Sequence, residues 1–165
     1  MYRKFFMIIC VALLLIKFES ASSQVRVITD LASFEKNFLS TTSDSVFLIN
    51  FWATWCKPCV AELPYIVALD SIYKDKPYKT ILMCLDVVKK LDSAVIPFLQ
   101  KKHIQTQTYI LDLGDPNIWI DMVDPSWSGS IPATLIVTKS GNLFFEQEFH
   151  AQHELTDILK PLFNH

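Results

Sequence analysis

Two cysteines three positions apart are the residues of this sequence best suited to chemistry. Cys56 and Cys59 form a Cys-X-X-Cys pair, and such a pair can either close and reopen a disulfide or bind zinc. Zinc needs four ligands, and the sequence has neither a second cysteine pair nor a suitably spaced set of cysteines and histidines. The residue types therefore favour redox chemistry at sulfur. We expect no metal and no cofactor, because the two sulfur atoms carry both electrons.

The sequence around the pair predicts a strand that leads to it and a helix that starts at it. Residues 46–52 are almost continuously apolar, which is typical of a strand buried on both faces in a parallel sheet. From residue 57 to residue 73 the apolar positions fit a helix. Pro64 should kink that helix, because proline lacks a donor and clashes with the preceding turn. The dithiol is therefore expected at the N-terminal end of a helix.

This position assigns different roles to the two cysteines. Unpaired backbone donors, the positive end of the helix dipole and the neighbouring Lys57 stabilise a thiolate at Cys56, which makes Cys56 the expected nucleophile. Cys59 lies one turn further on and can resolve a mixed disulfide with a partner protein. Pro58 costs no hydrogen bond in the first turn and stiffens the loop. Trp55 offers partners a flat surface, so Trp55, Lys57 and Pro58 are candidate substrate contacts.

The rest of the chain predicts a mixed sheet with helices between its strands. The other strand candidates are residues 25–28, 80–88, 109–113, 133–138 and 143–149, and the other helix candidates lie near residues 31–38, 95–99 and 155–162. Alternating strands and helices imply parallel crossovers. The last two strands flank a short turn with Gly141, which is typical of a hairpin. The pattern predicts one α/β domain, parallel with an antiparallel edge.

The first 23 residues are typical of a secretory signal peptide. Two basic residues precede an apolar run over residues 5–16, and small or polar residues follow up to Ser23. As a helix this run would rise only about 18 Å, whereas a bilayer core is ~30 Å thick. We therefore expect residues 1–23 to be cleaved. Residues 24–165 should form one exported domain, periplasmic or otherwise outside the cytoplasm, with no stable membrane insertion.

Charge and cysteine count narrow the function further. Residues 1–23 hold three of the 15 basic and one of the 17 acidic side chains, so the remaining domain has a formal charge of about −4. This balance argues against nucleic-acid binding, which needs a basic surface. Cys84 would remain as a third, unpaired cysteine within an apolar strand, and this setting predicts an inert thiol.

The segment Phe-Trp-Ala-Thr-Trp-Cys-Lys-Pro-Cys at residues 51–59 resembles the active-site stretch of the thioredoxin superfamily. Pro64 matches the proline inside that family's active-site helix, and the segment around Ile131 and Pro132 is similar to its cis-proline loop. The resemblance implies a thioredoxin fold, with a central mixed sheet of about five strands and helices on both faces. It also implies a cis bond before Pro132, beside the dithiol, and substrate pairing along the backbone of Ile131.

The sequence Glu62-Leu63-Pro64 and the signal peptide look more like the TlpA/ResA branch of exported thioredoxins. This resemblance implies a reductant of protein disulfides in the cell envelope, supplied with electrons by a membrane protein. It also implies that Glu62 helps to move the proton of the buried cysteine. Asn50 stands where cytoplasmic thioredoxins carry a buried aspartate. This difference removes one candidate base, so that either Glu62 becomes more important or the proton transfer becomes slower.

Two alternatives stay open at this point. The chain could donate its disulfide as an oxidant, since the two residues between the cysteines tune the potential over a wide range. An isoleucine before Pro132, as in reducing thioredoxins, argues against that direction. The domain could also be a binding module in which the disulfide between Cys56 and Cys59 is only structural. Such a pair would resist reduction.

Overall fold

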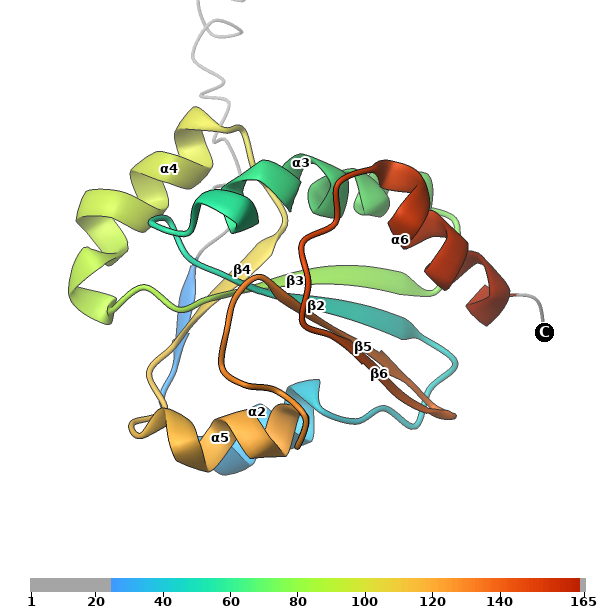
Figure 1. Ribbon diagram of the computed structural model, residues 1–165, viewed down its shortest axis with the longest axis horizontal. Coiled ribbons are helices and arrows are strands. Elements are labelled where there is room, and N and C mark those ends of the chain that lie inside the picture. Colours follow the sequence, from blue (N-terminus) through green and yellow to red (C-terminus); the bar gives the residue numbers. More distant parts are fainter. Residues whose placement is uncertain (1–24, 164–165) are drawn as a thin grey trace, which may run out of the picture.

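A mixed sheet of six strands forms the centre of the structure, in the order β1-β4-β3-β2-β5-β6 (Figure 1). The computed structural model describes residues 25–163, so the predicted signal peptide lies outside the described residues. The strands are β1 (Arg26–Ile28), β2 (Val46–Trp52), β3 (Tyr78–Cys84), β4 (Gln107–Leu111), β5 (Ala133–Thr138) and β6 (Gly141–Phe145). The expectation of about five strands and a mixed sheet is confirmed, with the short β1 as the sixth strand.

The strand directions bring one set of loops together. Strands β1, β4, β3 and β2 run parallel, whereas β5 pairs antiparallel with both β2 and β6. The carboxyl ends of the four parallel strands therefore meet at one edge, on the left in Figure 1. Such an edge is where open α/β sheets commonly place their functional groups.

Helices cover both faces of the sheet. On one face lie α3 (Lys57–Ile72), α4 (Ile96–Lys101) and α6 (Gln152–Leu159), and on the other lie α2 (Leu31–Phe38) and α5 (Pro116–Val123) (Figure 1). Short helical turns η1 (Val88–Lys90), η2 (Leu91–Val95) and η3 (Lys160–Phe163) complete the fold. Asp30 caps the N-terminus of α2, because its Oδ2 accepts the Ser33 backbone N–H at 2.8 Å.

The alternation of side chains along β2 builds a separate core on each face. Leu48 and Trp52 pack with Leu63 and other residues of α3 in one apolar cluster. Ile49 and Phe51 point the other way and join a second cluster beneath α2 and α5. Because successive strand residues face opposite sides, a strand buried on both faces must be apolar throughout. This explains the nearly unbroken apolar run in β2.

Two strands differ from their predicted limits. Strand β3 ends at Cys84, four residues before the predicted end, because Asp86 turns back to bind the active-site loop. Strand β6 ends at Phe145, and Phe149 lies buried against the α3 side of the sheet. Between β4 and β5 the chain forms the short helix α5, whose buried Trp119 packs on Trp127. Among residues 25–163, no helix combines the length and apolar character that crossing a membrane requires.

Candidate active site

Cys56 and Cys59 form a disulfide at the start of α3. Cys56 is the N-cap residue, and its sulfur accepts the backbone N–H of Cys59 at 3.3 Å. Cys56 keeps 5% of its surface exposed and Cys59 keeps none, so Cys56 is the cysteine that a partner can reach. Once the disulfide opens, the same backbone donors and the positive end of the helix dipole stabilise a Cys56 thiolate.

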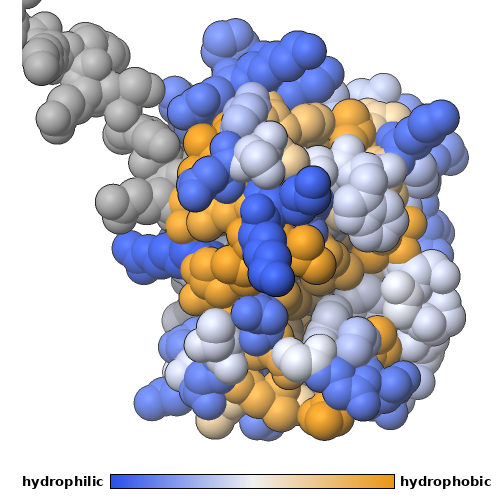
Figure 2. Space-filling view, turned by 90° about the vertical axis from the view of Figure 1, so that its left-hand side faces the viewer, coloured by the Kyte–Doolittle hydropathy of each residue, from blue (hydrophilic) through white to orange (hydrophobic). Residues whose placement is uncertain are grey.

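Exposed side chains surround the dithiol on the face where the parallel strands end. Trp55 is 66% exposed, and Lys57 and Pro58 are also exposed. Val87, just beyond β3, is likewise 66% exposed. Figure 2 looks onto this side of the molecule, where apolar side chains gather near the middle of the face with polar ones among and around them. The cysteine that partners can reach therefore lies within a partly apolar surface.

The loop before β5 brings Ile131 and Pro132 to the dithiol. The peptide bond between them is cis, and the carbonyl oxygen of Ile131 lies 3.7 Å from the Cys56 sulfur. Pro132 is buried, whereas Ile131 is half-buried. The structure therefore brings Cys56, Cys59 and the Ile131 backbone together, although 75 residues separate Cys56 from Ile131.

Two side chains hold this loop in place, one from the loop itself and one from the segment just after β6. Trp127 donates its indole N–H to the Ser130 carbonyl oxygen at 2.8 Å. The Glu146 carboxylate accepts the backbone N–H of Ser128 and that of Ser130, each at 3.1 Å, and also the Ser128 hydroxyl. These hydrogen bonds hold the pKa of Glu146 below its ordinary range. The position of the Ile131 carbonyl thus depends on β6 as well as on its own loop.

Glu62 is fully buried on α3, one turn after Cys59. Its Oε1 accepts a hydrogen bond from Asn50 Nδ2 at 2.7 Å, and its Oε2 accepts the Phe149 backbone N–H at 2.9 Å. Burial raises the pKa of this carboxyl from 4.5 to about 7, and the two hydrogen bonds partly oppose that rise. A carboxyl with such a pKa can both accept and release a proton near neutral pH.

Asp86 fixes the loop between β2 and the dithiol. Its carboxylate accepts the backbone N–H of Thr54 at 2.7 Å and the Thr54 hydroxyl at 2.8 Å. The thiol of Cys84 donates to the same carboxylate at 3.3 Å. Burial raises the pKa of the Cys84 thiol well above its ordinary value, which keeps this cysteine in its unreactive thiol form.

Some parts of this site were missing from the sequence-based prediction. Asp86 and Glu146 were given no role, although Asp86 follows a strand at the edge where the parallel strands end, which is a usable signal. Nothing in the sequence marks the backbone of Phe149 as a partner of Glu62. Trp127, which was also given no role, is buried with 4% exposure.

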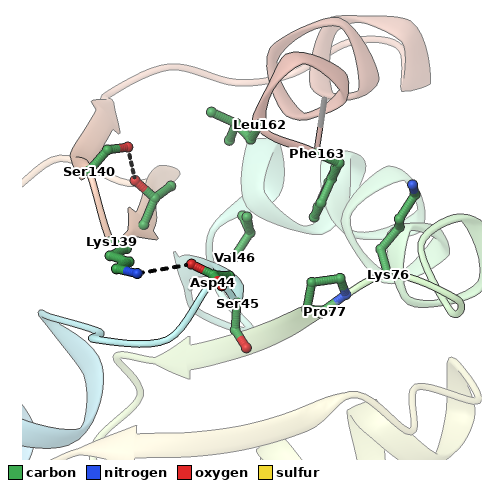
Figure 3. Close-up of a pocket in the computed structure, with 10 residues that line it drawn as sticks. Asp44, Ser45, Val46, Lys76, Pro77, Lys139, Ser140, Leu162 and Phe163 are labelled. Atoms are coloured by element: carbon green, nitrogen blue, oxygen red, sulfur yellow. Dashed lines mark hydrogen bonds and ion pairs between the residues drawn. The ribbon is translucent and has the colours of Figure 1, made fainter. Parts of the chain in front are cut away.

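The structure also has a pocket far from the dithiol. This pocket of about 660 Å³ opens at the amino ends of β2 and β3, beside the turn between β5 and β6 (Figure 3). Val46 and Phe163 line it, and Lys139 forms an exposed ion pair with Asp44 at 3.2 Å across its mouth. Within residues 25–163, no cluster of three histidine, cysteine or acidic side chains could hold a metal ion.

Comparisons with known proteins agree with this site. The Redoxin family matches residues 22–147. The thiol-disulfide oxidoreductase ResA of Bacillus thuringiensis subsp. konkukian is 31% identical over 137 residues, which make up 82% of this chain and 73% of that protein. ResA of Geobacillus kaustophilus is 30% identical over 117 residues, or 71% of this chain and 62% of that protein.

Solved structures share the fold at lower identity. A DsbF homologue from Corynebacterium diphtheriae has a TM-score of 0.60 at 17% identity, with 73% of each chain covered. A thioredoxin-related protein from Neisseria meningitidis serogroup B has a TM-score of 0.60 at 22% identity, covering 71% of this chain and 84% of that one. These similarities establish the thioredoxin fold. The Redoxin match, the ResA relatives and the Cys56–Cys59 disulfide show that this chain belongs to the Redoxin family and is a thioredoxin-like thiol-disulfide oxidoreductase.

Proposed function

We propose that this chain reduces disulfides of partner proteins outside the cytoplasm, with Cys56 as the attacking residue. The observation that carries the proposal is the dithiol itself. The reachable Cys56 sulfur lies at a helix N-terminus, and the buried Glu62 lies one turn beyond Cys59. The names of the ResA relatives support thiol-disulfide chemistry of this kind.

The reaction needs only sulfur chemistry and one proton carrier. In the reduced protein, the Cys56 thiolate attacks a partner disulfide, forms a mixed disulfide and releases the first partner sulfur as a thiolate. Cys59 then gives its proton to the Glu62 carboxylate and attacks the Cys56 sulfur. The bond between Cys56 and the partner breaks, the Cys56–Cys59 disulfide forms, and the second partner sulfur leaves as a thiolate. Two electrons pass to the partner, whose thiolates take up protons from Glu62 and from water.

The surroundings of the dithiol support a protein as the partner. The Ile131 backbone offers an edge along which an extended partner segment can pair, with Pro132 fixing the loop beside the dithiol. Trp55, Lys57 and Pro58 are neighbours of Cys56 in the chain and are exposed. A partner disulfide would bind at Cys56, in contact with the Ile131 backbone and with these exposed side chains.

The proposal includes export and an external electron supply. The sequence of residues 1–23 supports a cleaved signal, with residues 24–165 as the exported domain, periplasmic where the host has a periplasm. N-terminal sequencing of the exported protein should then begin at Gln24. A reductant in an oxidising compartment must be re-reduced, and we propose a membrane-bound dithiol protein as the donor. Membranes of the host that carry this donor should reduce the Cys56–Cys59 disulfide of the purified protein, measured by trapping of free thiols, whereas Cys59→Ser, which cannot resolve a mixed disulfide, should trap substrate proteins through Cys56.

Replacement of Cys56 tests the proposed activity. Cys56→Ser should abolish reduction of a protein disulfide substrate such as insulin, measured with dithiothreitol as the electron source. Cys84→Ala is the matched control, because it removes a buried thiol outside the dithiol, and it should retain activity. A Cys56→Ser protein that still reduces insulin would disprove the assignment.

The reduction potential of the Cys56–Cys59 pair tests the direction of electron flow. A value near that of thioredoxin, about −270 mV, is expected for a reductant, whereas about −120 mV would identify a disulfide donor. Equilibration against glutathione or dithiothreitol buffers with trapping of free thiols gives this value. A disulfide that resists reduction by both buffers would instead indicate a binding module.

A further inference from the structure

A buried amide lies between the Glu62 carboxyl and the strand that follows the cis-proline loop. Asn50 in β2 is fully buried and is paired in register with Thr134 of β5. Its Nδ2 donates to Glu62 Oε1 at 2.7 Å and to Thr134 Oγ1 at 3.1 Å, and lies 3.5 Å from the Ala133 carbonyl oxygen. The amide nitrogen is therefore well supplied with acceptors.

The amide oxygen of Asn50, in contrast to the nitrogen, has no hydrogen-bond partner although it is buried. An unpaired buried acceptor is costly. Rotation of the amide by half a turn would exchange Oδ1 and Nδ2. With Glu62 ionised, that rotation would place Oδ1 against a carboxylate oxygen, and two acceptors would repel each other. The observed orientation is thus the one that suits the ionised form of Glu62.

Protonation of Glu62 reverses this preference. A protonated Oε1 becomes a donor, and it would then face the N–H groups of Asn50, which are also donors. After the half-turn, Oδ1 can accept the Glu62 O–H, and the Thr134 hydroxyl can donate to Oδ1 because a hydroxyl serves either role. The number of unpaired side-chain atoms does not rise, because the amide nitrogen replaces the amide oxygen as the unpaired atom. The half-turn also gives up the long 3.5 Å contact of Nδ2 with the Ala133 carbonyl oxygen. In both the ionised and the protonated form of Glu62, the Phe149 backbone N–H can keep its hydrogen bond to Oε2.

We propose that Asn50 is a positioning residue whose side-chain amide rotates with the protonation of Glu62, so that the carboxyl has a matching partner in both of its forms. This inference rests on the proposed role of Glu62 as proton carrier for Cys59. It adds that Thr134, in the strand after the cis-proline loop, changes its hydroxyl from acceptor to donor when Glu62 is protonated. The charged groups that act on Glu62 from the segment after β6 are Glu148 and His150, and both stay in place in the experiments below.

Nuclear magnetic resonance of the oxidised protein tests the rotation without any redox turnover. The side-chain amide signals of Asn50, labelled with ¹⁵N, should change with pH at the same midpoint as the ¹³C-labelled Glu62 carboxyl. In Glu62→Gln this pH-dependent change of the Asn50 signals should vanish. Asn50 signals that stay constant through the titration of Glu62 would overturn the inference.

Replacement of Asn50 tests its effect on the carboxyl. Asn50→Leu removes a donor to the ionised form, so the Glu62 midpoint should rise by about one unit, a tenfold change in proton affinity. Thr108→Val is the control, because it removes a different fully buried polar group of the sheet, the Thr108 hydroxyl on β4, and it should leave the midpoint unchanged. An unchanged midpoint in Asn50→Leu would refute the positioning role.

A second variant and a separate activity assay distinguish a folding defect, a failed inference and a failed proposed function. If Asn50→Leu does not fold, Asn50→Asp keeps the shape and should split the titration into two steps, because two buried carboxyls then share one proton. A single step at the original Glu62 midpoint in Asn50→Asp would refute the positioning role. The reductase assay of Cys56→Ser tests the proposed function separately, so constant Asn50 signals beside an inactive Cys56→Ser would remove only this inference.

Discussion

Replacing Glu62 with glutamine should change how the stability of the oxidised protein depends on pH. The pKa of Glu62 rises from 4.5 to about 7, because burial outweighs the hydrogen bonds from Phe149 and Asn50. In the unfolded chain the same carboxyl ionises at its ordinary pKa of 4.5. Between the two values the folded protein binds more protons than the unfolded chain, so the free energy of unfolding falls as pH rises.

The size of this effect follows from the two pKa values. A rise from 4.5 to about 7 corresponds to about 3 kcal/mol. This contribution of Glu62 is complete below pH 4.5, decreases between pH 4.5 and pH 7, and is absent at higher pH. Asp30 and Glu146 have lowered pKa values, so their contributions have the opposite sign and are lost in acid. Both residues are present in either protein, and their effects cancel in the comparison.

Urea denaturation of the oxidised protein between about pH 4.5 and pH 8 measures the difference. As pH increases across this range, the free energy of unfolding of Glu62→Gln minus that of wild type should increase by about 3 kcal/mol, whatever this difference is at any single pH. Glu35→Gln, on the exposed side of α2, controls for the loss of one surface carboxylate. Parallel stability curves for wild type and Glu62→Gln would show that the buried carboxyl does not titrate in this range.

Three other substitutions test the supporting structure. Asp86→Ala should lower the free energy of unfolding by about 1–3 kcal/mol in urea denaturation, because the Thr54 N–H and hydroxyl lose their acceptor. A smaller loss would mean that water replaces the carboxylate. Phe34→Ala should cost about 3–5 kcal/mol in the same assay, because this fully buried ring fills the core beneath α2. Trp55→Ala should change stability by less than about 0.5 kcal/mol, since the ring is 66% exposed. It should slow reduction of insulin but not of a small disulfide such as oxidised glutathione, and equal losses on both substrates would argue against a role in partner binding.

Local sequence was enough to predict the dithiol and the elements that carry it. An apolar run, a Cys-X-X-Cys pair and a helical pattern with Pro58 in its first turn place Cys56 at a helix N-terminus, and the structure agrees. These signals are short-range, because strand burial, helix capping and the helix dipole each act over a few residues. The resemblance to thioredoxins added what local pattern could not, namely the cis bond before Pro132, which the structure contains.

Other features depended on residues that lie far apart in the chain. Asp86 binds a loop 32 residues earlier, and Glu146 holds the loop that presents Ile131. The end of a predicted parallel strand gives a signal that Asp86 belongs to the site, but the partners of both residues depend on how the strands pair. The same holds for the ends of β3 and β6, because tertiary hydrogen bonds and burial, rather than propensity, decide where each strand stops.

Residue type and spacing are enough to predict a reactive cysteine pair at a strand-to-helix junction. The surroundings of Glu62, in contrast, depend on the packing of distant segments. Its spacing from Cys59 was visible in the sequence, but its full burial and its partners Asn50 and Phe149 were not. A carboxyl's pKa depends on desolvation and on hydrogen bonds from other elements, and these arise only when β2, α3 and the segment after β6 pack together.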